Sequence, residues 1–139
     1  MESLLDSLRT RIGAVAGVDF NALIVQVYRD GDDGVNWHGD NNPAGGPEPV
    51  IASLSFGATR RFQLRPVGQK SVEVDLALAS GDVLVMRGDL QRTHVHKVPR
   101  EELPTGPRIN LTFRRLDGDA APLKAPVEHS TRVVPWPFD

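Results

Sequence analysis

The sequence of 139 residues contains no cysteine. A disulfide framework, a thiolate metal site and a cysteine nucleophile are therefore excluded, and a cytoplasmic location is expected. No apolar run approaches the roughly 18 residues that a membrane span requires. The first ten residues carry two acidic side chains and no long apolar run, so they are not expected to form a signal peptide. No association with a membrane is expected.

A strong charge of either sign is also missing, because 16 Lys and Arg residues face 18 Asp and Glu residues and the net charge is -2. Such a chain has no global attraction for nucleic acid and can bind a polyanion only through a local patch. Basic residues that could form such a rim are Arg60, Arg61, Arg65, Lys70, Arg87, Arg92, Lys97 and Arg100. Glu101 and Glu102 would repel a phosphate backbone.

Helical periodicity is confined to the start of the chain. Apolar residues recur at helical spacing over residues 2–15, and Gly17 is expected to end this helix. Short alternating or apolar segments separated by turn residues follow, which is typical of strands. The expected strands are 22–29, 35–40, 50–56, 60–67, 71–79, 83–88, 93–98 and 108–116. Their number favours a mainly β fold, as a sandwich, jelly roll or barrel.

A chain of this length is expected to form one domain. Residues 1–116 hold all the predicted elements and form the candidate core. Residues 117–139 are rich in proline and small residues, so we predict an irregular C-terminal extension. His129 lies in that extension and is a weak candidate for any site.

The segment VNWHGDNN places His38 and Asp40 two residues apart, directly before a run of turn residues. On a strand both side chains would lie on one face. With a second histidine they could form the triad of two histidines and one carboxylate that holds Fe(II) and leaves coordination positions open. His94 and His96, which also share a strand face, are the candidates. The alternative is that all four are only the polar ends of strands.

The last predicted strand, RINLTFR, alternates polar and apolar residues. Its polar positions are Arg108, Asn110, Thr112 and Arg114. An ordinary antiparallel strand would turn this face to water. However, two arginines six residues apart, or roughly 20 Å along a strand, could also lean together and bracket a small dicarboxylate. The planar guanidinium suits this, because it binds a carboxylate through two parallel hydrogen bonds.

Several segments together resemble the AlkB-type Fe(II)/2-oxoglutarate-dependent dioxygenases. They are FNALIVQVYRDGDDGVNWHGD, PVIASLSFGATRRFQLR, GDVLVMRGD, HKVP and PRINLTFR, in the order and near the spacings of that family. The similarity covers about residues 18–116, and RINLTFR is its specific part. It implies a double-stranded β-helix (jelly roll) and the cofactors Fe(II), 2-oxoglutarate and O2.

The resemblance assigns roles by position. His38, Asp40 and His96 would be the catalytic residues and metal ligands, because His96 precedes KVP and lies twelve residues before Arg108. Arg108 and Tyr28 would hold the distal carboxylate of 2-oxoglutarate.

Further roles follow in the same way. Arg114 would help at the metal-bound end of 2-oxoglutarate, and Asn110 would add a hydrogen bond. Gln26 stands where the family usually has asparagine, with the same amide chemistry, so cofactor binding is expected to survive. His94 would line the substrate side, and Asn42 replaces an acidic residue that touches the flipped base in relatives.

The activity implied is oxidative demethylation of N-alkylated bases in DNA or RNA, an alkylation-repair reaction that releases formaldehyde, succinate and CO2. The nucleic acid is expected to be single-stranded or flipped out of a duplex, and the protein a monomer. One alternative is a 2-oxoglutarate-dependent hydroxylase of a small molecule or a protein side chain, which the near-neutral charge favours. A non-enzymatic β domain is the other alternative, and it would leave the retained ligand types unexplained.

Two departures from the family stand out. AlkB-type proteins carry a substantial segment before the helix at 2–15, and it forms much of the lid that grips the nucleotide. This sequence starts at that helix, so it is expected to be either a truncated core or a minimal member without most of the nucleotide-recognition segment. Trp37 would point away from His38 on a regular strand, and we expect it to pack in the core rather than stack on a base.

Overall fold

The computed structural model describes residues 3–117 and 131–135. Its elements are α1 (Leu4–Ala16), β1 (Ala22–Tyr28), β2 (Val35–His38), the 3-10 helix η1 (Pro43–Gly45), β3 (Ile51–Gly57), β4 (Arg60–Pro66), β5 (Val74–Leu78), β6 (Val83–Met86), α2 (Leu90–Thr93), β7 (His94–Val98), β8 (Arg108–Arg114) and β9 (Thr131–Pro135). None of the helices in these two ranges is long and apolar enough to cross a membrane. The predicted mainly β fold with an N-terminal helix is confirmed.

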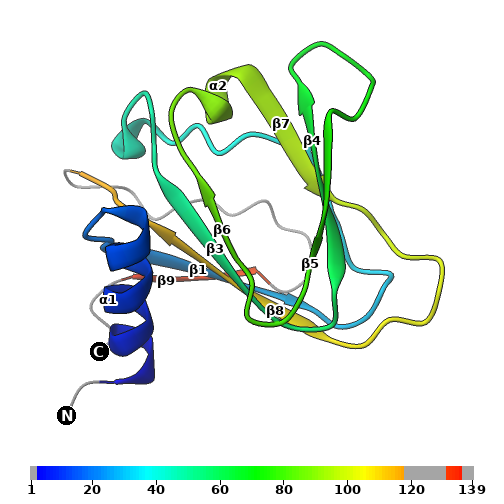
Figure 1. Ribbon diagram of the computed structural model, residues 1–139, viewed down its shortest axis with the longest axis horizontal. Coiled ribbons are helices and arrows are strands. Elements are labelled where there is room, and N and C mark those ends of the chain that lie inside the picture. Colours follow the sequence, from blue (N-terminus) through cyan, green and yellow to red (C-terminus); the bar gives the residue numbers. More distant parts are fainter. Residues whose placement is uncertain (1–2, 118–130, 136–139) are drawn as a thin grey trace.

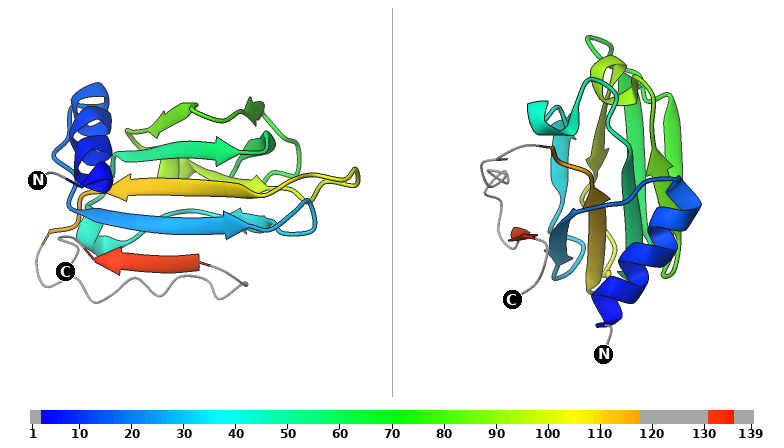
Figure 2. Two further views of the ribbon diagram at one scale, coloured as in Figure 1. Left: turned by 90° about the horizontal axis from the view of Figure 1, so that it is seen from below. Right: turned by 90° about the vertical axis from the view of Figure 1, so that its left-hand side faces the viewer.

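The strands form two antiparallel sheets (Figure 1). The larger sheet has the order β6-β3-β8-β1-β9, and the smaller sheet has the order β2-β7-β4-β5. Figure 2 shows β3, β8, β1 and β9 running side by side. Strand β8 is the middle strand of the larger sheet and pairs with β1 on one side and β3 on the other. Its side chains therefore project from the centre of both faces of this sheet.

Helix α1 packs against one end of the outer face of the larger sheet (Figure 2), where it forms an apolar cluster with β1, β3 and β8. The cluster consists of Ile12, Ala16, Phe20, Leu23, Ala52, Leu54, Leu111 and Phe113. The helix begins after Ser3, whose hydroxyl accepts the backbone N–H of Asp6, and ends at Gly17 with φ of 73°. Glycine suits this left-handed conformation because it has no Cβ. The predicted helix end is confirmed.

A second apolar cluster fills the space between the two sheets. It consists of Tyr28, Ile51, Phe62, Leu64, Leu78, Met86 and Val98. Alternate residues of a strand point to opposite faces, so Ile51 lies in this cluster while the next residue, Ala52, lies under α1. The larger sheet is therefore buried in part on both faces, whereas Val27, Phe56 and Ile109 on its outer face are exposed.

The structure differs from the sequence-based description in three segments. Strand β5 begins only at Val74, and Val72 is exposed. A short helix, α2, stands in the segment between the expected strands 83–88 and 93–98. The C-terminal extension is not irregular throughout, because β9 pairs with β1 and becomes an edge strand of the larger sheet. The valines of TRVVP favour an extended chain, and β1 offers them an open edge. The rest of the extension, residues 118–130 and 136–139, lies outside the described residues.

Candidate active site

The polar residues of β8 are buried, not solvated. Arg108 is 1% exposed and Arg114 is 9% exposed, and Asn110 and Thr112 between them are buried too. The smaller sheet covers this face of β8, whereas an uncovered sheet would have left it in water. Burying a guanidinium costs free energy unless partners replace its water. This row of residues therefore marks a candidate site between the sheets.

In the middle of this row, Asn110 and Thr112 form hydrogen bonds within the larger sheet. The Ser53 hydroxyl donates to Oδ1 of Asn110 at 3.1 Å, and Nδ2 of Asn110 donates to Ser53 Oγ at 2.7 Å. The Thr112 hydroxyl donates to Oδ1 of Asn110 at 2.9 Å. Gln26 lies opposite Asn110 in the β1–β8 register and is half-buried. The amide positions that the sequence singled out thus lie together on the inner side of the sheet.

Arg108 keeps unused hydrogen-bonding capacity. Its Nη2 donates to Ser55 Oγ at 2.9 Å, but its Nε and Nη1 are buried without a hydrogen-bond partner among the described residues. The guanidinium lies over the ring of Tyr28, 5.0 Å from the ring centroid. Burial lowers the pKa of Arg108, and burial raises the pKa of Tyr28 despite the nearby positive charge. A buried cation with two donor nitrogens that lack a partner among the described residues fits a carboxylate ligand.

His38, Asp40 and His96 meet at one point between the sheets. One candidate ligand atom from each lies within 4.8 Å of the others. Asp40 Oδ2 is 3.3 Å from His96 Nε2, and Asp40 Oδ1 is 3.9 Å from His38 Nε2. His38 Nδ1 is 2.7 Å from the carbonyl oxygen of Asn36, to which it donates. This bond leaves the lone pair of His38 on Nε2, directed toward the group that could hold a metal ion.

The electrostatics of the group favour the metal-binding forms of Asp40 and His38. Burial by itself raises the pKa of Asp40, but contact with His96 and with the Arg114 guanidinium outweighs burial and holds this pKa below its ordinary value. Burial, helped by the charge of His96, lowers the pKa of His38. An ionised carboxylate and a neutral imidazole are the forms that bind a metal ion.

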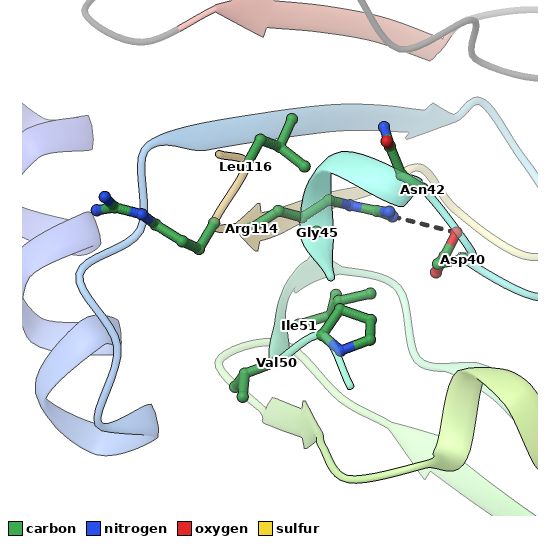
Figure 3. Close-up of a pocket in the computed structure, with 9 residues that line it drawn as sticks. Asp40, Asn42, Gly45, Val50, Ile51, Arg114 and Leu116 are labelled. Carbon is green, nitrogen blue, oxygen red and sulfur yellow. Dashed lines mark ion pairs between the residues drawn. The ribbon is translucent and has the colours of Figure 1, made fainter. Parts of the chain in front are cut away.

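A pocket opens beside Asp40 (Figure 3). Arg114 crosses it, and its Nη2 lies 3.2 Å from Asp40 Oδ1. Apolar side chains such as Ile51 form the opposite wall, and Asn42 lies at the edge. Oδ1 of Asn42 accepts the backbone N–H of Ala44 at 2.9 Å and caps η1. The amide N–H groups of Asn42 take no part in that bond.

Asp40 does not lie on a strand with His38. Strand β2 ends at His38, so the predicted shared strand face is wrong. Instead, the backbone N–H of Asp40 donates to Oε1 of Gln91 at 3.0 Å, and Gln91 is a residue of α2 that is 2% exposed. Gly39 passes close to α2, because a Cβ at this position would lie 3.1 Å from the Gln91 carbonyl oxygen. Sequence reasoning missed Gln91, because its contact with Asp40 joins residues 51 positions apart and no local sequence pattern predicts it.

His94 stands apart from the metal-binding group. Its Nε2 lies 3.3 Å from Oε1 of Glu73, and its Nδ1 lies 2.8 Å from the Thr93 hydroxyl. His96 is therefore the histidine that joins His38 and Asp40 among the described residues, which do not include His129.

Trp37 does not pack in the core as expected. Neither apolar cluster contains it. The cationic groups of Arg65 and Lys97 lie 4.1 Å and 4.9 Å from its ring centroid. The indole is half-buried, and these cation–π contacts stabilise it outside both apolar clusters.

Many of the basic residues that could have formed a rim are already engaged. Arg60 is buried. Arg61 and Arg92 are paired with aspartates. Arg87 donates to the carbonyl oxygen of Ala16 at 2.9 Å. The eight candidates therefore do not form one free basic surface.

The site and the fold define a class of protein. Two imidazoles and one carboxylate form the ligand set of non-haem Fe(II) oxygenases, which leaves coordination positions open for reactants. The Nε and Nη1 groups of Arg108, which have no partner among the described residues, are buried between the sheets and could receive a carboxylate. This donor set, inside two facing β sheets, is that of an oxygenase that uses iron and a 2-oxo acid.

The family comparison agrees with this class. Residues 1–114 match the 2OG-Fe(II) oxygenase superfamily, and the chain belongs to it. The family implies Fe(II), 2-oxoglutarate and O2 as cofactors, and the His-Asp-His group could hold the metal.

Individual relatives carry AlkB names, so the AlkB-type resemblance is confirmed. The chain is 40% identical over 124 residues to alpha-ketoglutarate-dependent dioxygenase alkB homolog 3 of Homo sapiens, covering 84% of this chain and 43% of that protein. It is 36% identical over 120 residues to DNA oxidative demethylase ALKBH2 of Mus musculus, covering 81% and 50%. The solved structure of OsALKBH1 matches with a TM-score of 0.55 and 27% identity over 67% of this chain and 47% of that chain, which confirms the predicted jelly roll. The chain thus spans about half the length of these relatives.

Proposed function

We propose that this chain catalyses the Fe(II)- and 2-oxoglutarate-dependent oxidative demethylation of N-alkylated bases in nucleic acid, with release of formaldehyde, succinate and CO2. The observation that carries the proposal is the His-Asp-His group beside a buried arginine that has unpaired N–H groups. The relatives at 36–40% identity, one of which is named a DNA oxidative demethylase, support the substrate class.

In this proposal His38, Asp40 and His96 hold the metal. Bound iron with 2-oxoglutarate and O2 supplies the oxidising chemistry. Contacts with His96 and Arg114 keep Asp40 ionised. The Asn36 carbonyl fixes the His38 ring. These contacts orient ligand atoms toward a common point before any metal is present, which lowers the cost of binding.

Arg108 and Tyr28 are the proposed anchor for the distal carboxylate of 2-oxoglutarate. The two residues are opposite each other in the β1–β8 register, and the unpaired Nε and Nη1 of Arg108 supply two donors. Arg114, whose Nε is also buried without a partner among the described residues, would serve the metal-bound end. Asn110 and Gln26 lie between these two ends on the same inner face and would add amide hydrogen bonds.

On the substrate side, the proposal keeps His94 and Asn42 as candidate contacts to the base. Asn42 lies at the edge of the pocket beside Asp40 and has amide N–H groups outside its capping bond. A base inside a duplex cannot reach a buried metal, so the target would be single-stranded or flipped. A preference for single strands, a monomeric state and a cytoplasmic location belong to the same proposal.

A second candidate is a hydroxylase of a small molecule or a protein side chain. The observation that favours it is the engagement of Arg61, Arg87 and Arg92 with partners inside the chain, which removes free cations from a nucleic-acid surface. Both candidates use the same metal and 2-oxoglutarate site.

The test incubates the purified chain with Fe(II), 2-oxoglutarate, ascorbate and a single-stranded oligonucleotide that contains 1-methyladenine. Mass spectrometry follows methyl loss and succinate together, with His96→Ala as the inactive control and Arg61→Lys as the matched surface control. Methyl loss in step with succinate supports the first candidate. Succinate without methyl loss favours the second, and absence of both products from the wild-type chain contradicts the proposal.

A further inference from the structure

Arg60 is an arginine whose side chain is 0% exposed, although its sequence neighbour Arg61 has a side chain that is 54% exposed. Its guanidinium donates three hydrogen bonds to main-chain carbonyl oxygens. Nη1 donates to Asp30 at 3.1 Å, and Nη2 donates to Asp33 at 2.8 Å and to Pro99 at 2.7 Å. Buried arginines are rare and need such partners, so the position of Arg60 requires a reason beyond surface charge.

The three carbonyls belong to two connections that leave the candidate site. Residues 29–34 follow Tyr28 at the end of β1, and Pro99 follows β7, the strand that carries His96. The two connections also touch directly, because the backbone N–H of Glu101 donates to the carbonyl oxygen of Gly31 at 2.8 Å. Arg60 therefore joins the segment after the proposed 2-oxoglutarate anchor to the segment after a proposed metal ligand.

The same guanidinium lies over the ring of Tyr28, 5.4 Å from its centroid, and the Arg108 guanidinium lies 5.0 Å from that centroid. Tyr28 is thus held by two cations at once. Neither arginine has a close carboxylate among the described residues, since the nearest ion pair is Arg60 Nε to Glu101 Oε1 at 3.9 Å. Two like charges around one buried ring repel each other, and a dianion bound at Arg108 would relieve that repulsion.

We infer that Arg60 is a positioning residue for 2-oxoglutarate, which sets the place of the Tyr28 ring and of the connection behind it so that Arg108 and Tyr28 together fit the distal carboxylate. The inference rests on the proposed function, because it presupposes that Arg108 and Tyr28 bind this co-substrate. In this inference Arg60 itself does not contact 2-oxoglutarate. The basic residue that the sequence suggested for a nucleic-acid rim thereby gains a role on the cofactor side.

The experiment compares Arg60→Lys with Arg61→Lys, a matched neighbour that pairs with Asp75 at the surface. Isothermal titration calorimetry measures the Kd of 2-oxoglutarate with Mn(II) in place of Fe(II), and thermal unfolding measures stability. Lysine keeps the charge but lacks the planar fork that reaches three carbonyls. The expected result is a Kd raised about tenfold in Arg60→Lys and unchanged in Arg61→Lys. In turnover, KM for 2-oxoglutarate should rise in step, while kcat at saturation changes by less than about twofold.

A double-mutant cycle with Tyr28→Phe separates positioning from general support. If Arg60 acts through Tyr28, the two substitutions raise Kd together by less than the product of their separate effects, because contacting residues are not additive. A lower melting temperature with an unchanged Kd in Arg60→Lys would overturn the inference. Failure of the wild-type chain to bind 2-oxoglutarate with Mn(II) would instead overturn the proposed function on which it rests.

If Arg60→Lys does not fold, Gly34→Ala carries the test. A Cβ at Gly34 would lie 2.7 Å from the Val98 carbonyl oxygen, so the 29–34 connection must shift away from the end of β7 without loss of a buried charge. The expected result is again a raised Kd for 2-oxoglutarate in a folded protein. An unchanged Kd in folded Gly34→Ala would contradict the inference.

Discussion

The two sides of strand β8 carry opposite chemistry. The outer face places Leu111 and Phe113 under α1 in an apolar cluster. The inner face of the same strand carries Arg108 and Arg114, whose guanidinium groups keep buried N–H atoms without partners among the described residues. Apolar burial stabilises the fold, whereas unpaired buried charge destabilises it. The comparison teaches that on β8 the side facing α1 serves stability, whereas the side facing the smaller sheet gives up stability for ligand binding.

Phe113→Ala should destabilise the apolar cluster between α1 and the outer face. Phe113 is 1% exposed and lies 6.1 Å, between ring centroids, from Phe20. Removing a buried aromatic ring costs about 3–5 kcal/mol of unfolding free energy. Chemical denaturation measures the loss, and the Kd of 2-oxoglutarate for the remaining folded protein should be unchanged. A large change in that Kd would show that the two faces are coupled and would contradict the division between a stabilising side and a ligand-binding side.

Arg108→Met should weaken ligand binding at the inner face without weakening the fold. We expect the affinity for 2-oxoglutarate to fall by about 2–5 kcal/mol, because a buried charge pair loses one partner. The unfolding free energy should stay the same or rise, because an incompletely paired buried cation is replaced by an apolar side chain. Calorimetry and denaturation on the same preparation test both statements. Strong destabilisation with retained binding would mean that Arg108 is mainly structural.

Gln91→Leu should lower the affinity of the His-Asp-His group for metal. The substitution removes the oxygen that accepts the Asp40 backbone N–H. Loss of a group that orients a ligand typically lowers metal affinity about 10–100-fold. Titration with Mn(II) measures this affinity, and Gln63→Leu is the control, since Gln63 is also buried but bonds to Asp75 on the smaller sheet. Equal metal affinity in the two variants would show that Gln91 does not contribute to metal binding.

Ser3→Ala should give the smallest effect, and only on the outer side. The substitution removes the capping bond to the Asp6 backbone N–H. An N-cap of this kind contributes about 1 kcal/mol. Thermal unfolding should report that loss, whereas binding of 2-oxoglutarate and of Mn(II) should not change. Altered metal binding in this variant would contradict the separation of the helix layer from the site.

Much of the fold followed from local patterns. The helix over residues 2–15, its end at Gly17 and most strand positions were predicted, because amphipathic periodicity and turn residues act over a few residues. Helix α2 and strand β9 were not predicted. Four residues are too few for a periodic signal, and β9 depends on an open edge of β1 that only the assembled sheet provides.

The chemistry of the candidate site was visible in residue types and in resemblance to a family, but its assembly was not. Alternation in RINLTFR separates two faces, yet it does not say whether the polar face meets water or a second sheet. His94 and His96 share a strand face, and only the folded chain brings His96, not His94, to Asp40. The role of Gln91 at Asp40 likewise depends on a contact between distant segments.

The sequence by itself determined the alternation, the helix with its glycine end and the set of side chains able to bind a metal and a carboxylate. Only the tertiary structure decided that the polar side of β8 would be buried and that Arg60 would lie buried against Tyr28 while Arg61 lies at the surface. The physical reason is that periodicity fixes which side chains share a face, whereas burial depends on what the rest of the chain packs against that face.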